Sequence, residues 1–141
     1  MEILMNVIIC TDSPILLNRL VTILSELSHL HVAGVTNTLD EAEAEIRKNN
    51  AQVFITAFHN IHKTVFKKLN GIKKNNSGLV VIVLTNNTAE QYLSQWKKAG
   101  ADYVFDQAMH FTKLMDILAG FVYKNFLESL RSNYYDEKKP V

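Results

Sequence analysis

Short apolar runs alternate with longer amphipathic stretches along most of this chain of 141 residues. The runs have the length and composition of strands that helices cover on both faces. The stretches between them repeat apolar residues with the period of a helix. This alternation predicts a doubly wound α/β domain with a parallel sheet. Because five strand–helix units can be counted, the expected arrangement is flavodoxin-like, with five strands in the order 2-1-3-4-5.

Turn and capping residues mark the ends of these elements. The predicted strands are residues 6–10, 31–36, 52–57, 79–84 and 103–106. The predicted helices are residues 14–27, 38–49, 63–74, 88–98 and 112–130. The candidate caps are Asp12 or Ser13 for the first helix, Thr38 with Glu41 for the second, and Asn87 or Thr88 for the fourth.

The composition indicates one domain, expected over residues 1–131, followed by a polar, flexible tail over residues 132–141. Hydrophobic residues make up 48% of the chain and charged residues 21%, as in ordinary globular proteins. No apolar run approaches the roughly 18 residues that a membrane span requires. The start lacks the features of a secretory signal, and Cys10 is the single cysteine. We therefore expect a cytoplasmic protein without a disulfide and without a following output domain.

The charge balance argues against nucleic-acid binding. Fifteen basic residues against fourteen acidic residues leave a net charge of +1, whereas nucleic-acid binders usually carry a basic excess. The densest basic cluster consists of Lys63, Lys67, Lys68, Lys73 and Lys74. Helical spacing distributes these lysines around a solvated face, so we expect neither a nucleic acid nor a membrane as a partner.

Several short segments fall at the predicted ends of strands or in the turns beside them. They are Cys10-Thr11-Asp12-Ser13-Pro14, Gln52-Val53-Phe54-Ile55-Thr56-Ala57, Val83-Leu84-Thr85, Ala99-Gly100-Ala101-Asp102 and Asp106-Gln107-Ala108. In this order and at these spacings, they resemble the receiver domain of two-component response regulators, the CheY-like domain, from about residue 6 to about residue 122. The resemblance implies a domain that takes a phosphoryl group from a histidine kinase onto its own aspartate.

The resemblance also implies where the site residues stand. Receivers place the acceptor aspartate at the end of the third strand and an acidic pair that helps hold Mg²⁺ after the first. A hydroxyl follows the fourth strand, a lysine follows the fifth, and an aromatic residue three positions before the lysine reports the modification. At these positions the chain has Ala57, the pair Thr11 and Asp12, Thr85, Gln107 and Val104.

Most of the receiver chemistry is replaced at these positions. Ala57 has no nucleophile, Thr11 stands where an acid is expected, and Gln107 is uncharged. The losses agree with one another, because a buried lysine without the aspartates would carry a large desolvation cost. Asp12 is interpreted mainly as a helix cap and Thr85 as a locally hydrogen-bonded residue. We therefore interpret the chain as a pseudo-receiver without a phosphoaspartate, a metal, a cofactor or enzymatic activity.

The favoured hypothesis is a stand-alone signalling domain that acts by protein–protein contact. The resemblance implies that the fourth helix, the fifth strand and the fifth helix bind a signalling protein or form a homodimer. The candidate contact residues are Tyr92, Trp96, Tyr103, Phe105 and Phe111. The alternative for Tyr92 and Trp96, which is slightly preferred, is that they pack inward on the sheet. The apolar stripe of the last helix also continues beyond Tyr123, which favours contact with another subunit.

Two further hypotheses use the same edge of the sheet. A small ligand could occupy a vacated pocket lined by Thr11, Ala57, His59, Thr85 and Gln107, although no glycine-rich phosphate loop follows the first strand. A working enzyme is disfavoured, because the sequence shows neither paired carboxylates nor an activated nucleophile there.

Three other residues could carry chemistry. His59 and His62 lack a third metal ligand and are expected to be exposed in a loop. His59 also follows the acceptor position closely, so lining a repurposed site and accepting a phosphoryl group remain alternatives for it. Cys10 is expected to be a small core residue, since nothing nearby lowers the pKa of its thiol.

Overall fold

Within the described residues, 4–58, 61–87, 89–107 and 111–138, the computed structural model contains one sheet of five strands. The strands are β1 (Met5–Thr11), β2 (Leu30–Thr36), β3 (Val53–Ala57), β4 (Val80–Thr85) and β5 (Tyr103–Asp106). All neighbouring strands are parallel, and their order is β2-β1-β3-β4-β5. The predicted 2-1-3-4-5 arrangement is therefore confirmed.

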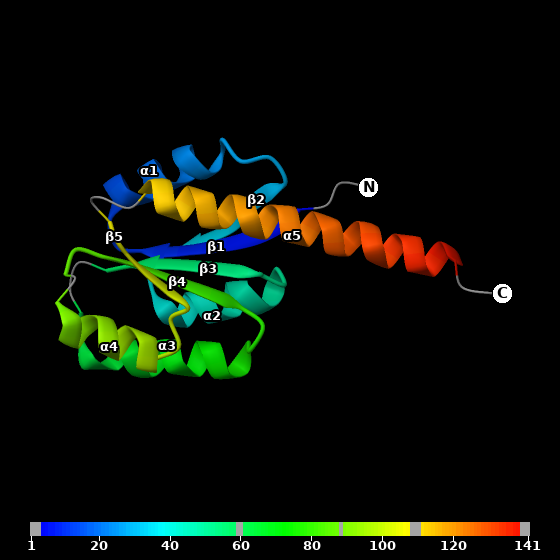
Figure 1. Cartoon of the computed structure of the whole chain (residues 1–141). Helices are drawn as coiled ribbons and strands as arrows, with labels where there is room; N and C mark the ends of the chain where they lie inside the picture. Colours follow the sequence, from blue (N-terminus) through cyan, green and yellow to red (C-terminus); the bar gives the residue numbers. More distant parts are fainter. Residues whose placement is uncertain (1–3, 59–60, 88, 108–110, 139–141) are drawn as a thin grey trace.

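Helices cover both faces of this sheet (Figure 1). On one face lie α1 (Pro14–Leu24) and α5 (Phe111–Lys138). On the other face lie α2 (Leu39–Lys48), α3 (Lys63–Asn75) and α4 (Glu90–Lys98). This is the doubly wound α/β architecture that the alternation of elements predicts.

The side chains of β1 alternate between two hydrophobic cores. Val7 and Ile9 pack toward α1 and α5, whereas Ile8 and Cys10 pack toward α2, α3 and α4. All four side chains are fully buried. Burial of an aliphatic side chain stabilises the fold by about 1.5–3 kcal/mol. A shift of β1 by one residue would exchange the two sets between the cores, so burial fixes the register.

Two helices differ in length from the prediction. α1 ends at Leu24 instead of residue 27, because the chain turns at Ser25 and His29 then adopts a left-handed φ of 64°. α5 continues to Lys138 instead of ending near residue 130, since no glycine or proline interrupts residues 121–138. The expected tail is therefore helical as far as Lys138. Of the helices described, none combines the length and the apolarity needed to cross a bilayer.

The helix caps correct two predictions. Ser13 caps α1, and its hydroxyl accepts a hydrogen bond from the Leu16 N–H at 3.2 Å. Asp12, the other candidate, which is interpreted from the sequence mainly as a cap, lies one residue too early for that bond. The N-cap residue of α4 is Ala89, which makes no side-chain bond. Asn87 instead accepts from the Ala89 N–H at 3.0 Å, and the other candidate, Thr88, lies outside the described residues.

The predicted cap of α2 is confirmed. The Thr38 hydroxyl accepts a hydrogen bond from the Glu41 N–H at 3.3 Å. Asp40 and Glu41 also place negative charge in the first turn, where the helix dipole favours it. The N-terminus of α2 is therefore stabilised by the Thr38 cap and by the acidic residues of its first turn.

Cys10 is a core residue, as predicted, and has no exposed surface. It pairs in register with Thr36 on β2 and with Thr56 on β3. Burial raises the pKa of the Cys10 thiol to about 11, against a smaller lowering by the neighbouring threonine hydroxyls. The thiol therefore stays protonated at neutral pH and is not an effective nucleophile.

A polar latch joins α3 to β4 and to the turn before β5. Asp102 Oδ2 accepts a hydrogen bond from the Val81 N–H at 2.8 Å and pairs with Lys73 Nζ at 2.8 Å. Lys73 Nζ also donates to the Leu79 carbonyl. Gly100 has a φ of 110°, and a Cβ there would meet the Lys73 side chain at 2.8 Å. The glycine and the aspartate of this turn therefore have a structural role.

The raised pKa of the Cys10 thiol predicts a loss of stability at high pH. The unfolded thiol ionises near pH 9 and the folded thiol near pH 11, so the contribution is complete below pH 9 and falls as pH rises toward 11. Between pH 8 and pH 11, we expect the free energy of unfolding to fall by about 2 kcal/mol more for the wild type than for Cys10→Ala. Denaturant titrations under reducing conditions measure this difference. Equal pH dependence of the two proteins would contradict the assignment.

Removal of the latch carboxylate should destabilise the fold. Asp102→Ala leaves the Val81 N–H and the Lys73 ammonium without their shared acceptor, so we expect the free energy of unfolding to fall by about 1–2 kcal/mol. Asp116→Ala is the matched control, because Asp116 is exposed on α5. The control should stay within about 0.5 kcal/mol of the wild type in urea denaturation. Indistinguishable effects of the two substitutions would show that the latch contributes nothing.

Candidate functional site

The carboxyl ends of β1, β3 and β4 meet at one edge of the sheet. Thr11 and Ala57 are register partners at the ends of β1 and β3, and Thr85 ends the adjacent β4. Gln107 follows β5, and its backbone N–H donates to the Thr85 carbonyl at 3.0 Å. Asp12 follows Thr11 and is exposed. The structure thus brings the predicted pocket residues to one edge.

The two threonine hydroxyls of this edge are engaged by nearby backbone groups. Thr11 Oγ1 accepts from the Ser13 N–H at 3.2 Å. Thr85 Oγ1 accepts from the Asn87 N–H at 3.1 Å and donates to the Asn87 carbonyl at 3.2 Å. Both threonines are nearly fully buried. Their hydroxyls therefore shape the two loops, which is the local role expected for Thr85.

Few charged or reactive side chains lie at this carboxyl edge of the sheet. Ala57 is 2% exposed and contributes only a methyl group at the end of β3. Gln107 is half-buried and carries an uncharged amide, while the Asp12 carboxylate lies on the exposed side. Across the described part of the chain, no group of three or more His, Cys, Asp or Glu side chains is placed to hold a metal ion. The end of β3 therefore lacks the carboxylate that receiver chemistry needs.

The loop after β3 contains the two candidate histidines. His59 lies outside the described residues. His62 is exposed and is the N-cap residue of α3, where it makes no side-chain bond to the helix. A role for His59 therefore stays a prediction.

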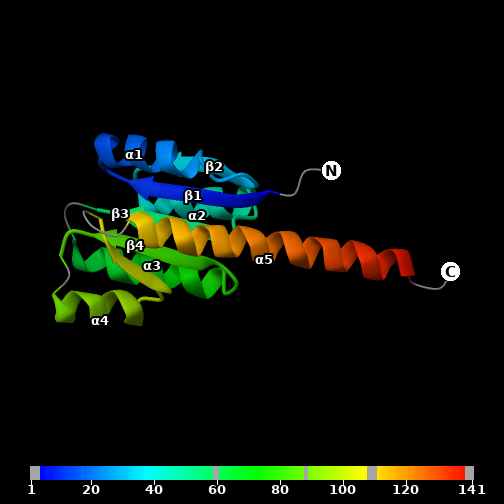
Figure 2. The same cartoon turned by 45° about the horizontal axis from the view of Figure 1, so that its top comes forward.

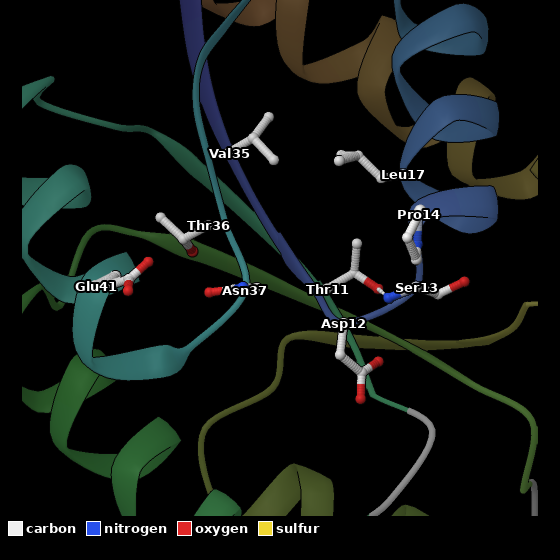
Figure 3. A pocket seen from close by; sticks show the side chains of 9 residues that line it. All are labelled: Thr11, Asp12, Ser13, Pro14, Leu17, Val35, Thr36, Asn37 and Glu41. Atoms are coloured by element: carbon white, nitrogen blue, oxygen red, sulfur yellow. Dashed lines mark hydrogen bonds between the residues drawn. The ribbon is translucent and has the colours of Figure 1, made fainter.

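A cavity of about 400 Å³ opens beside the edge, between the start of α1 and the β2–α2 loop (Figure 3). Thr11, Asp12 and Glu41 contribute its polar lining, together with other residues of the same loops. Of the described residues expected to line a vacated ligand pocket (Thr11, Ala57, Thr85 and Gln107), only Thr11 is part of this cavity. The cavity is therefore displaced toward β2 and away from Ala57.

The side chains of β5 alternate between the two cores. Val104, at the expected switch position, packs against the core under α2, α3 and α4. Tyr103 and Phe105 pack against the opposite core, with their rings stacked at a centroid distance of 6.0 Å. The aromatic side chains therefore cannot replace a switch residue at position 104, as predicted from strand alternation.

The structure corrects one of the proposed contact residues. Trp96 is 2% exposed and packs on Phe66 of α3 with a centroid distance of 4.6 Å, so it cannot be an exposed anchor in this state. The preferred alternative of inward packing is thus confirmed for Trp96. Tyr92 is half-buried, and so is Phe111, which packs against the Arg19 guanidinium at 4.3 Å.

Besides exposed apolar residues elsewhere, such as Ile15 of α1, three exposed apolar side chains lie on the second half of α5. Tyr123 is 65% exposed, Leu127 44% and Leu130 46%. Their spacing of four and three residues places them along one side of the helix. The predicted continuation of the apolar stripe beyond Tyr123 therefore includes exposed side chains.

No family model matches the chain, and no curated protein sequence matches it. Solved structures do match. The isolated receiver domain of RcsB from Salmonella enterica serovar Typhimurium, in the presence of the phosphomimetic BeF3−, is 26% identical with a TM-score of 0.72. The match covers 82% of this chain and 86% of that chain.

Two other structures extend this likeness. A CheY-like response regulator receiver domain protein from Methanospirillum hungatei JF-1 is 17% identical, with a TM-score of 0.71 and coverage of 89% of this chain and 98% of that one. The RcsB response regulator of Salmonella typhimurium is 23% identical, with a TM-score of 0.70 over 84% of this chain. This chain spans 60% of the length of that RcsB structure. The strand order, the covering helices and these similarities show that the chain has the fold of the CheY-like receiver domains of response regulators.

Proposed function

We propose that this chain is a signalling domain of a two-component phosphorelay that accepts no phosphoryl group at position 57 and acts by protein–protein contact. The observation that carries the proposal is Ala57. It ends β3 beside Thr11 of β1, where the resemblance to receivers implies an acceptor aspartate, and it is buried. A methyl group cannot form an acyl phosphate.

The groups around Ala57 support the proposal. Mg²⁺ is bound mainly through carboxylates, water and phosphate oxygens. Asp12 supplies one carboxylate, but the neighbouring Thr11 hydroxyl already accepts the Ser13 N–H. Gln107 stands where a cation is expected and cannot neutralise phosphoryl charge. The whole set therefore favours an uncharged edge over a site for phosphoryl transfer.

The loop after β4 supports a single conformational state. The Thr85 hydroxyl is held by both backbone groups of Asn87. Val104, which packs in the core, has no aromatic ring that could move inward. A domain without phosphorylation and without this switch is regulated through binding partners or abundance.

The contact surface that the structure offers is the second half of α5. The helix projects beyond the sheet (Figure 2), and this part carries Tyr123, Leu127 and Leu130 on its exposed side. A groove of about 310 Å³ adjoins Tyr123 and is lined by apolar groups that include Leu27 and Phe126. α5 therefore carries exposed apolar side chains and also lines part of a groove. A surface with both features can pair with a second copy of itself, which favours a symmetric homodimer.

Exposure to a small phosphodonor tests the first part of the proposal. With acetyl phosphate and Mg²⁺, we expect the intact mass of the wild type to stay unchanged. The triple variant Thr11→Asp, Ala57→Asp, Gln107→Lys restores the acceptor, the acidic pair and the cation. This variant should gain the mass of one phosphoryl group, and the gain should be lost on return of residue 57 to alanine. A stoichiometric phosphoryl gain by the wild type would refute the proposal.

Disruption of the apolar stripe tests the second part. We expect light scattering to give a dimer mass for the wild type and a monomer mass for Leu127→Glu with Leu130→Glu, because each change places a charge in an apolar contact. Lys113→Glu is the control, since Lys113 is exposed on the first turn of α5. This control should remain dimeric. A monomeric wild type at all concentrations, or dimers in all three proteins, would exclude this surface.

A further inference from the structure

A groove of about 480 Å³ separates α3 from α4 on the face opposite α5. Three lysines line it, Lys63 and Lys67 from α3 and Lys98 from α4. Phe66 and Ala99 contribute apolar surface between them. Phe66 is held in place because its ring packs on buried Trp96. The groove thus combines an apolar surface with converging positive charge.

Of the three α3 lysines outside the groove, two form ion pairs and Lys74 forms none within the described residues. Lys68 pairs with Asp40 at 3.2 Å, and Lys73 pairs with Asp102 at 2.8 Å. For the lysines of the groove, no ion pair is formed with any carboxylate in the described part of the chain. No acidic side chain lines the groove either. The ion pairs of the domain therefore use Lys68 and Lys73 and leave the charge of the groove lysines uncompensated.

The placement of Lys63 and Lys67 is unfavourable for α3. Lys63 is the first residue of α3, where the helix dipole disfavours a cation, and the first turn contains no acidic residue. Lys67 follows at a spacing of four, which brings two like charges together. His62 adds no capping bond. α3 therefore gains no stability from Lys63 and Lys67, whereas Lys98 lies in the last turn of α4, where the helix dipole favours a cation.

We propose that the α3–α4 groove binds an acidic segment of a partner protein. Carboxylates of the segment would pair with Lys63, Lys67 and Lys98, and an apolar side chain between them would pack against Phe66 and Ala99. Only the premise that the domain works by protein contact is taken from the proposed function. The groove is separate from the α5 surface, so one domain has room for a second copy and a partner.

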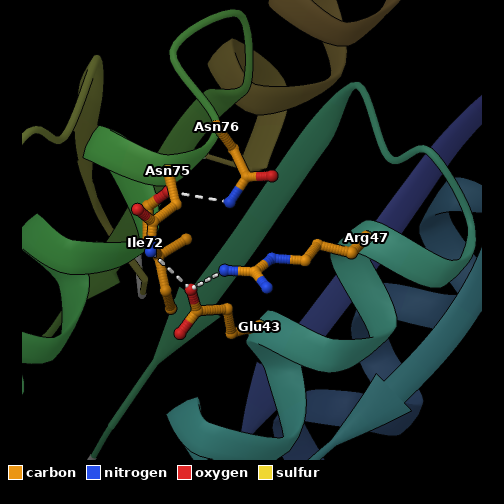
Figure 4. Close-up of polar contacts among 5 residues, drawn as sticks. All are labelled: Glu43, Arg47, Ile72, Asn75 and Asn76. Atoms are coloured by element: carbon orange, nitrogen blue, oxygen red, sulfur yellow. Dashed lines mark hydrogen bonds and ion pairs between the residues drawn. The ribbon is translucent and has the colours of Figure 1, made fainter.

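The acidic helix of a second copy fits the groove poorly, because the carboxylates of Asp40, Glu43 and Glu45 are already engaged. In α2, Glu43 Oε1 accepts from Arg47 Nη2 at 2.9 Å and from Asn75 Nδ2 at 2.8 Å (Figure 4). Asp40 is paired with Lys68, and Glu45 accepts from Asn49 Nδ2 at 3.0 Å. These contacts would have to break before α2 could bind in trans.

Nucleic acid is also a poorer match than an acidic peptide. A bound duplex needs a basic track that follows several successive phosphates. Here the charge converges on one groove, and the chain as a whole has a net charge of only +1. An apolar surface bounded by lysines suits a peptide in which carboxylates flank a hydrophobic side chain.

Peptide titration tests this proposal directly. The probes are the peptide Glu-Glu-Leu-Phe-Glu-Glu and its uncharged counterpart Gln-Gln-Leu-Phe-Gln-Gln. Trp96 is the single tryptophan and contacts Phe66, so its fluorescence reports occupancy of the groove. We expect the glutamate peptide to bind with a Kd on the order of 100 µM or tighter and the glutamine peptide to bind at least about tenfold more weakly.

Charge-reversal variants separate the groove from general attraction. We expect Lys63→Glu with Lys67→Glu to weaken binding of the glutamate peptide at least about tenfold. The matched control is Lys74→Glu with Lys97→Glu, which makes the same charge change at exposed positions outside the lining. This control should bind within about twofold of the wild type, and circular dichroism should show that both variants are folded.

Several outcomes would overturn the proposal. They are equal binding of the two peptides, equal weakening by the two double variants, and absence of binding at millimolar peptide. Tighter binding of oligo-dT than of the glutamate peptide, lost in Lys63→Glu with Lys67→Glu, would assign the groove to nucleic acid instead. The phosphodonor experiment is independent of these results, so failure of the groove and failure of the phosphorylation proposal can be distinguished.

Discussion

Helices cover both faces of the parallel sheet, and the resulting burial determines where every residue of the site lies. In β1, Val7 and Ile9 belong to one core while Ile8 and Cys10 belong to the other. A slip by one residue would exchange the two sets, so packing fixes the register. That register sets Thr11 beside Ala57 at the carboxyl edge. The geometry of the edge therefore depends on the cores beneath it and persists when the site chemistry changes.

The replacements at the edge form a consistent set. Without a carboxylate at position 57, a buried cation beside it would be unpaired, and Gln107 avoids that cost. The two threonines of the edge, Thr11 and Thr85, form hydrogen bonds with Ser13 and Asn87 in their own loops. An edge of this kind keeps the shape of a receiver while losing the charges that drive phosphoryl transfer. Under the two proposals above, contact surfaces on α5 and between α3 and α4 would carry the regulation.

The sequence predicts the elements whose periodicity is visible within a few residues. The strand order follows from the alternation of strands and helices, the resemblance to receivers implies that Thr11 and Ala57 share one edge, and the structure confirms both. Asp12 and Ser13 are both good capping residues. Ser13 is the cap because α1 begins at Pro14, directly after it. Local patterns leave this choice open because both side chains carry suitable acceptors.

Tertiary contacts account for the remaining differences. Tyr92 and Trp96 share one helix side in the sequence, but Phe66 of another helix covers Trp96. The lysine cluster looks like a solvated face until Lys98, far away in the chain, is placed opposite Lys63 by the packing of α3 and α4. Such sites depend on residues from two helices, so no window of sequence contains them.

The most direct test of an uncharged, unswitched edge is an amide NMR titration with Mg²⁺ and BeF3−. The account predicts that the amide resonances of Thr85, Asn87 and Gln107 keep their positions, because no carboxylate at position 57 is present to bind beryllofluoride. Saturable shifts of these resonances that require both Mg²⁺ and BeF3− would contradict it. Such shifts would show that the edge still binds a phosphoryl mimic and changes conformation in response.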